Sequence, residues 1–194
     1  YSPVVLVGIR PEQLTEANFI RFDRAAPLGL EPSGPVSYTQ WNGGNSSEVF
    51  NGSESSDAMM GMHGEDVLNG FGGDDFLNGS SGDDVVNGGD GRDFLFGGGG
   101  IDILTGGAGG DTFHFRDQSE ADIITDFQLG IDKLDLSAFG GYYAIVQVGA
   151  DTRVQLSSRD YVLLKNIAAS DLRSTDFLGL TWTYDRVLTG TAGY

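Results

Sequence analysis

A large apolar side chain recurs at every ninth residue between residues 43 and 114. Another apolar residue usually comes just before it, and a polar or small residue usually follows. Segments such as FLN (76–78) and VVN (85–87) are too short for helices and predict short strands, with the middle residue on one face and its neighbours on the other. The recurring middle residues are Phe50, Met59, Leu68, Leu77, Val86, Leu95, Leu104 and Phe113.

Glycine shares this period of nine. If the unit is numbered from Gly43, position one is glycine in all eight units, and position four is glycine in the last six but serine at Ser46 and Ser55. A flexible linker has no reason to place an apolar side chain at every ninth residue, so we reject a glycine-rich linker. Alternating turns and strands predict a flattened coil of 18 residues per circuit, with turns stacked about 4.8 Å apart. We therefore expect an all-β protein with a parallel β-roll of eight nonapeptide repeats.

An acidic residue occupies position six of every unit. In the coil these acids form two columns, one with Glu48, Asp66, Asp84 and Asp102 and one with Asp57, Asp75, Asp93 and Asp111. Carboxylates stacked so closely repel one another unless they take up protons or share a cation. Carboxylate oxygens and exposed glycine carbonyls suit calcium, which favours six to eight oxygen ligands, better than magnesium. We expect about five or six Ca2+ ions, with metal binding coupled to folding.

The units GSSGDDVVN (79–87), GGDGRDFLF (88–96) and GGAGGDTFH (106–114) resemble the repeat-in-toxin (RTX, hemolysin-type) family of calcium-binding β-rolls. The resemblance implies calcium between the turns, export by the bacterial type I secretion machinery and a secreted, extracellular or cell-surface location. Glu48, Ser46 and Ser55 depart from the family pattern, which makes the first turns the least certain calcium sites. The metal-binding residues expected from the pattern and the resemblance are Asp57, Gly61, Gly64, Asp66, Gly70, Gly73, Asp75, Gly79, Gly82, Asp84, Gly88, Gly91, Asp93, Gly97, Gly100, Asp102, Gly106, Gly109 and Asp111.

The segment after the repeats, ADIITDFQLGIDKLDLSAF (121–139), resembles the segment that closes the roll in secreted serralysin-type metalloproteases. That resemblance implies a last calcium held by Asp122 and Asp132; solvated loop acids are the open alternative. Beyond it, YYAIVQVG, TRVQLSS and DYVLLKNI alternate like antiparallel capping strands. Residues 170–178 predict a short helix or turn that begins near Ser170 or Asp171.

These features divide the chain into four parts. Residues 1–42 are expected to be a strand segment and connector at the end of a preceding module, 43–114 the calcium-binding β-roll, 115–180 the capping region, and 181–194 the start of a next unit or a tail. Residues 4–20 align with 162–178, although chance similarity between short amphipathic segments is a rival explanation. The chain is then a block excised from a larger secreted protein, and we expect it to be a monomer.

Composition limits the function. The net charge of −17 argues against nucleic-acid partners and anionic membranes, and no apolar run reaches the length of a transmembrane segment. Cysteine is absent, which excludes disulfides and thiolate metal sites. No zinc-protease, serine-hydrolase or phosphate-binding motif occurs, and neither His63 nor His114 has a second histidine placed to assist it. We therefore expect no catalytic residues and no enzymatic activity.

The leading hypothesis is a non-catalytic calcium-binding module. Two alternatives stay open: an adhesion or surface-layer module that binds glycan or neighbouring subunits, and an accessory domain of a secreted hydrolase or polysaccharide-modifying enzyme. Position seven bears on this choice, because it faces outward yet is mostly apolar. Its side chains either pack under flanking segments or form an exposed strip for a partner. At position nine, Asn51, Asn69, Asn78 and Asn87 could form a hydrogen-bonded ladder.

Overall fold

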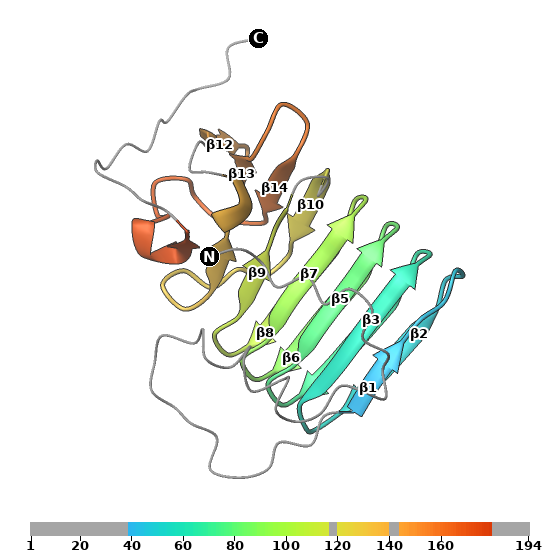
Figure 1. The fold of residues 1–194 in the computed structure, drawn as a ribbon. Helices are drawn as coiled ribbons and strands as arrows, with labels where there is room; N and C mark the ends of the chain where they lie inside the picture. The colour runs from blue at the N-terminus through green and yellow to red at the C-terminus, as the bar shows by residue number, and fades with distance from the viewer. Residues whose placement is uncertain (1–38, 117–119, 140–143, 180–194) are drawn as a thin grey trace. The chain divides into compact units, whose positions relative to one another are not determined.

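The computed structural model describes residues 39–116, 120–139 and 144–179, which form two β-sheets and two short 3₁₀ helices (Figure 1). The seven-stranded sheet has the order β1 (Thr39–Asn42), β3 (Asp57–His63), β5 (Phe76–Ser81), β7 (Phe94–Gly99), β9 (Thr112–His114), β11 (Lys133–Asp135) and β15 (Phe177–Leu178). The eight-stranded sheet has the order β12 (Ala144–Val148), β13 (Asp151–Gln155), β14 (Tyr161–Leu164), β10 (Ala121–Ile124), β8 (Ile103–Ala108), β6 (Val85–Asp90), β4 (Val67–Gly72) and β2 (Val49–Ser53). The segments expected at 4–20 and 181–194 lie outside the described residues.

 

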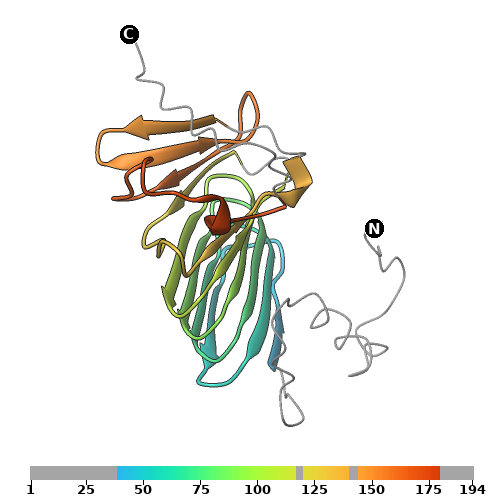
Figure 2. The ribbon, with the colours of Figure 1, turned by 90° about the vertical axis from the view of Figure 1, so that its left-hand side faces the viewer.

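The chain alternates between the two sheets and returns to each one after 18 residues. Leu77 in β5 pairs with Leu95 in β7, and Val86 in β6 pairs with Leu104 in β8, both in parallel register. Turns between the sheets bring equivalent positions of successive circuits above one another, as the two views of the ribbon show (Figures 1 and 2). The predicted parallel β-roll is therefore confirmed.

The core lies between the sheets and is built from position eight. These side chains, from Met59 to Phe113, are at most 1% exposed. Each one contributes roughly 1.5–3 kcal/mol through burial. Position seven faces outward as predicted: Val49 is 65% exposed, Phe76 38% and Ile103 40%. The alternation along three-residue strand segments thus decides which side chains form the core.

The glycines of the turns have two different roles. Positions two and four carry positive φ, as at Gly89 (116°) and Gly91 (141°), where a β-carbon would be strained. Position one has no such backbone requirement; glycine is needed there because a β-carbon at Gly70 would overlap the Asp75 carboxylate and the Gly88 carbonyl. Close approach alone therefore demands glycine at position one.

The coil begins before Gly43. Residues 39–42, assigned by sequence to the connector, form β1 and pair with β3 in the same 18-residue register, Trp41 opposite Met59. The nonapeptide pattern does not reveal this strand because the unit before Gly43 lacks the position-six acid and position-four glycine. Trp41 occupies the core row of the first circuit but is 39% exposed, because it lies at the end of the stack.

The capping region continues both sheets before it leaves the roll. β10 pairs in parallel with β8, and β11 pairs in parallel with β9. β12, β13 and β14 are antiparallel, as predicted. The short helix predicted after residue 170 is a 3₁₀ turn, Ser174–Asp176, and its N-cap is Arg173 instead of Ser170 or Asp171. No helix among the described residues is long and apolar enough to cross a membrane.

Candidate metal sites between the turns

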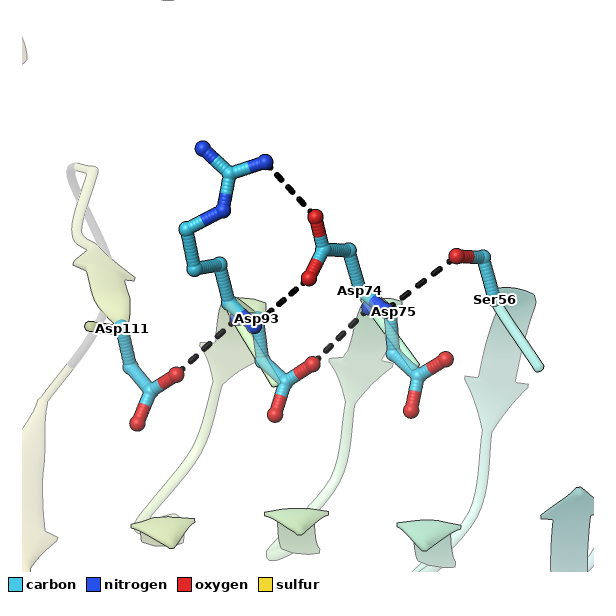
Figure 3. Close-up of polar contacts among 6 residues, drawn as sticks. Ser56, Asp74, Asp75, Asp93 and Asp111 are labelled. Carbon is cyan, nitrogen blue, oxygen red and sulfur yellow. Dashed lines mark hydrogen bonds and ion pairs between the residues drawn. The ribbon is translucent and has the colours of Figure 1, made fainter. Parts of the chain in front are cut away.

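The position-six aspartates line the inside of both turn columns and link one circuit to the next. All seven from Asp57 to Asp111 are at most 3% exposed. From Asp66 and Asp75 onward, the Oδ1 atom accepts a hydrogen bond from the backbone N–H of the equivalent residue one circuit earlier, whereas Asp57 accepts through Oδ2 from Ser53 N at 2.7 Å. Asp93 Oδ1 accepts from Asp75 N at 2.8 Å, and Asp111 Oδ1 accepts from Asp93 N at 2.9 Å (Figure 3). One oxygen of each carboxylate is thus committed to the fold.

The second carboxylate oxygen has no hydrogen-bond partner. This holds for Oδ2 of Asp66, Asp75, Asp84, Asp93, Asp102, Asp111 and Asp122, each of which is buried. Figure 3 shows the second oxygens of Asp75, Asp93 and Asp111 projecting to the same side of the column. A buried carboxylate oxygen without a partner costs several kcal/mol of desolvation. Seven such oxygens in regular order indicate sites for a cation.

Backbone carbonyls converge on the same places. The Oδ2 atom of Asp75 and the carbonyl oxygen of Gly88 both crowd the point where a Gly70 β-carbon would lie. The same arrangement recurs at Gly61, Gly79 and Gly88, each with its own aspartate and the position-one carbonyl of the next circuit. Position-four carbonyls also lie between circuits: Gly64 O crowds the point where a Gly82 β-carbon would lie. The turns therefore gather carboxylate and carbonyl oxygens between successive circuits.

The electrostatics of the columns oppose ionisation. Burial raises the pKa of Asp75 and Asp102 to about 6 and that of Asp84, Asp93 and Asp111 to about 7, and neighbouring carboxylates add to the increase. A bound divalent cation reverses this preference, because it stabilises the ionised form.

The donor set fits a hard cation that accepts backbone ligands. Among the described residues, no group of three or more His, Cys, Asp or Glu side chains is placed to hold a metal ion. A cation between turns must therefore draw much of its coordination from carbonyls, which calcium accepts and magnesium accepts poorly. The structure brings the predicted aspartate and glycine positions from Gly61 to Asp111 together between successive circuits, and their role as metal ligands stays a prediction.

The first turn of the repeat differs from the others. Glu48 is longer than aspartate, and its carboxylate accepts hydrogen bonds from Gly44 N at 3.0 Å and Ser46 Oγ at 2.8 Å within its own turn. The hydrogen bond from Gly44 lowers the pKa of Glu48. The carboxylate is thus satisfied without a metal, which agrees with the departure from the pattern at this position.

The two acids predicted after the repeats also differ from each other. Asp122 continues its column: Oδ1 accepts from Asp102 N at 2.9 Å, Oδ2 lacks a partner, and burial together with Asp102 raises the pKa of Asp122 to about 9. Asp132 is also buried, but its Oδ2 accepts from Gln128 N at 2.7 Å. Asp122 therefore resembles the repeat aspartates in having an oxygen available for a cation, whereas both oxygens of Asp132 hold the backbone.

Sequence reasoning missed a second set of residues, at position five. Ser56 Oγ accepts from Asp74 N at 3.1 Å, and Asp74 Oδ1 accepts from Arg92 N at 2.9 Å, while the Arg92 guanidinium pairs with Asp74 at 2.7 Å (Figure 3). Asp83 holds Ile101 N in the same way. The signal was visible as serine or an acid at position five of the first five units. These side chains link circuits on the outer side of the acid columns.

Asp126 was also missed. Its two carboxylate oxygens accept hydrogen bonds from Gly106 N at 2.9 Å and Gly107 N at 2.8 Å. The Asp126 carboxylate thus caps the turn that begins at Gly106. The sequence signal was the change in spacing from 18 to 20 residues between Asp102 and Asp122, which marks the end of the regular coil.

The asparagine ladder is present in one sheet. Asn69 donates to Asn51 at 2.8 Å, and Asn87 donates to Asn69 at 2.7 Å. Asn78 lies in the other sheet, where its amide oxygen accepts from Ser80 at 3.2 Å. Odd and even units contribute to different sheets, so Asn78 cannot join the ladder.

Comparison with known proteins identifies the repeats. The family model of the RTX calcium-binding nonapeptide repeat (4 copies) matches residues 42–77, 51–86, 69–104 and 87–117. Two similar solved structures are subunits of the Azotobacter vinelandii mannuronan C5-epimerase: AlgE6R2 (25% identity, TM-score 0.49, 79% of this chain and 100% of that one) and AlgE6R3 (23%, 0.39, 87% and 95%). The extracellular lipase LipA from Serratia marcescens is a third (13%, 0.37), with 75% of this chain matching 40% of the lipase. No curated protein sequence matches the chain.

Proposed function

We propose that the chain, whose residues 42–117 match the family model of the RTX calcium-binding nonapeptide repeat, is a non-catalytic module that folds when it binds calcium outside the cell. The observation that carries this proposal is the row of buried aspartates whose Oδ2 atoms lack a hydrogen-bond partner. Calcium is the cation that such oxygens and the adjacent carbonyls would hold.

The geometry suggests where the ions bind. Each ion would lie between successive acids of one column, held by their carboxylates and by glycine carbonyls. The pairs are Asp57–Asp75, Asp75–Asp93 and Asp93–Asp111 in one column, and Asp66–Asp84, Asp84–Asp102 and Asp102–Asp122 in the other. This arrangement gives about six ions, within the number expected from sequence. The pair Asp111–Asp132 is excluded from the proposal because the oxygens of Asp132 hold backbone N–H groups.

The coupling of metal to folding follows from the same oxygens. Without metal, the folded state must bury either ionised carboxylates or protons taken up at neutral pH, and both options are unfavourable. The unfolded chain hydrates the same carboxylates at no such cost. Calcium binds the assembled turns, so its binding free energy becomes folding free energy.

This coupling suits a protein that must be exported unfolded. We propose that the acidic chain stays largely unfolded at low cytosolic calcium, passes the type I secretion machinery, and folds outside or at the cell surface. The high negative charge of the chain favours the unfolded state when no metal is bound, because the acidic residues repel one another.

Circular dichroism tests the proposal directly. We expect the chain in excess chelator to lack most of its β-sheet signal and to regain it with millimolar calcium but not with magnesium. Calorimetric titration should then report about six ions. Equal β-sheet content in chelator and in calcium would contradict the proposal.

A second candidate function is that of an adhesion or surface-layer module. The observation in its favour is the exposure of apolar position-seven side chains, such as Val49 and Phe76, on the outer faces of the sheets. Calcium would then serve to build the surface that binds a partner.

A further inference from the structure

At positions seven and nine, the outer face of the seven-stranded sheet carries no charged side chain of its own over the first four strands, β1, β3, β5 and β7. His63 lies at the end of β3, and the Arg116 guanidinium lies over the Phe96 ring at the far side of this face, 5.5 Å from the ring centroid. Adjacent strands in this sheet lie in parallel register, which places positions seven and nine in two rows across them (Figure 1). The outward side chains are Gln40, Ala58, Phe76 and Phe94 in one row and Asn42, Met60, Asn78 and Phe96 in the other. We call this set the neutral face.

The neutral face is unusual for this molecule. The chain has a net charge of −17, and acids occupy the turns on both sides of the sheet. The next two strands of the same sheet already carry charged or titratable groups: His114 in β9, and Lys133 and Asp135 in β11. Only apolar groups and carboxamides lie beside Ala58 in the two rows, so a partner that binds there has no charge to satisfy.

Aromatic rings form a ladder along one side of this face. Phe76 and Phe94 stack with ring centroids 5.5 Å apart and planes 7° from parallel, and Phe94 in turn lies 5.4 Å from His114. Phe96 contacts His114 edge to face at 5.6 Å. One face of Phe76 is therefore covered by Phe94.

The ladder stops at Ala58. The methyl group of Ala58 is too short to cover the second face of Phe76, which is 38% exposed. The next side chain in the row, Gln40, is two strand spacings from Phe76, or about 9.6 Å. A ring held between two groups needs about 3.5 Å on each side, or about 7 Å in total. The gap above Ala58 thus has the width of one ring.

We propose that the neutral face binds an uncharged glycan, with one pyranose ring in the gap above Ala58. The ring would stack on the exposed face of Phe76, and its hydroxyl groups would exchange hydrogen bonds with the carboxamides of Gln40, Asn42 and Asn78. Ser80 donates to Asn78 Oδ1 at 3.2 Å and so helps to orient that amide. A carboxamide both donates and accepts, which matches the hydroxyl groups of a sugar.

The surface disfavours the other occupants. An acidic glycan beside Ala58 would meet no cation, since Arg116 contacts Phe96 two strands away, and it would be repelled by the acids of the turns. An aromatic side chain of a protein partner would fill the gap but would leave the three carboxamides without the hydroxyl partners that a sugar supplies. The inference rests on the fold and on these side chains, and it does not depend on how many calcium ions bind.

The experiment uses the full chain in saturating calcium and measures binding of cellohexaose, chitohexaose, mannohexaose and acidic hexamannuronate by calorimetry. We expect saturable binding of at least one neutral hexasaccharide. Ala58→Phe continues the ladder and closes the gap, so it should weaken binding tenfold or more, and Phe76→Ala should do the same. Val85→Ala, which changes an outward side chain of the other sheet, is the matched control and should bind like the unmodified chain.

Circular dichroism of each variant separates the two proposals, since a failure of calcium-coupled folding appears there and a failure of glycan binding appears only in the titration. The glycan proposal is overturned if no neutral hexasaccharide binds the folded chain, or if folded Ala58→Phe binds as well as the unmodified chain. Tighter binding of hexamannuronate, or equal competition by N-acetylphenylalanine amide, would also overturn it, the latter in favour of an aromatic protein partner.

Discussion

The backbone N–H of Asp75 donates a hydrogen bond to Oδ1 of Asp93, which lies one circuit later, while Oδ2 of Asp93 has no partner. The two oxygens of one carboxylate thus have separate roles: one holds the neighbouring circuit, and the other is left for a cation. This separation can be tested, because asparagine can keep the first role and lose the second.

Asp93→Asn should retain the hydrogen bond to Asp75 N through its amide oxygen and remove a charge shared by two proposed ion sites. We expect it to fold in calcium with one or two fewer ions and a smaller gain in stability from calcium, measured by calorimetry and thermal melting. Asp93→Ala should lose the hydrogen bond as well, at a further cost of about 1–3 kcal/mol. Asp74→Asn, at an exposed position that also holds a backbone N–H, is the matched control and should keep the ion count. An unchanged ion count in Asp93→Asn would contradict the assignment.

The stability of the metal-free chain should fall as pH rises from about 4 to about 7. Burial raises the pKa of Asp84, Asp93 and Asp111 to about 7 in the folded state from 3.8 in model compounds. The folded state therefore binds more protons than the unfolded state across this range, so its stability is greatest below the unfolded pKa and is lost as pH passes the folded pKa. Circular dichroism in chelator at several pH values measures the slope, since the folded fraction should be largest at the acidic end of this range.

Calcium should reverse that slope, because it binds the ionised carboxylates that protons neutralise. Melting temperatures in saturating calcium should rise over the same pH range. A metal-free folded fraction that increases with pH would show that the buried aspartates do not control stability in this way.

Glycine at position one should be indispensable for a steric reason alone. Gly70→Ala would place its β-carbon against Asp75 Oδ2 and the Gly88 carbonyl, and we expect a loss of about 1–3 kcal/mol together with weaker calcium binding. Gly110→Ala is the matched control, because its β-carbon would have no neighbour closer than 3.6 Å. Chemical denaturation of both variants in calcium compares them; equal stability would exclude the close approach as the reason for glycine.

The sequence predicted the parts of this fold that repeat. The period of nine assigned Leu68 and Leu77 to the core and Asp66 and Asp75 to the two columns, because one backbone conformation recurs and each residue type follows from it. It could not predict β1 from Thr39 to Asn42, where tertiary pairing with β3 forms a strand without the motif.

The parts of the site that the sequence did not reveal depend on which repeat units become neighbours when successive circuits stack. The placement of Asn78 in a different sheet from Asn51, Asn69 and Asn87 depends on this order, as does the end of the aromatic row at Ala58. The role of Asp126 at the last turn depends on the local change in spacing. These features are properties of neighbouring circuits, and they need the register of the strands, which the pattern within one unit does not contain.

Position two offers a gain in stability. Phe71 has a φ of 75°, a strained backbone conformation for a residue other than glycine. Its side chain is 52% exposed, so burial of the ring does little to offset that strain. A non-glycine residue in this region costs roughly 1–2 kcal/mol. Phe71→Gly should therefore be more stable than Phe71→Ala by about 1 kcal/mol in calcium, measured by denaturant unfolding. If Phe71→Ala were the more stable of the two, backbone strain would not be the dominant effect at this turn.

The first turn should accept a calcium ion if its sequence is restored to the repeat pattern. Glu48 satisfies its own carboxylate through Gly44 N and Ser46 Oγ, and it reaches them because its side chain is one methylene longer than aspartate. The next acid of the column, Asp66, already accepts a hydrogen bond from Glu48 N at 2.8 Å, as the regular pairs do. Glu48→Asp combined with Ser46→Gly should leave a carboxylate oxygen without a partner opposite Asp66 and so create an additional site. Calorimetry should report one more ion than in the unmodified chain, whereas Ser46→Gly alone, which leaves Glu48 bound to Gly44, should not change the count. An unchanged count in the double variant would show that the end of the stack, and not the side chain at position 48, prevents calcium from binding there.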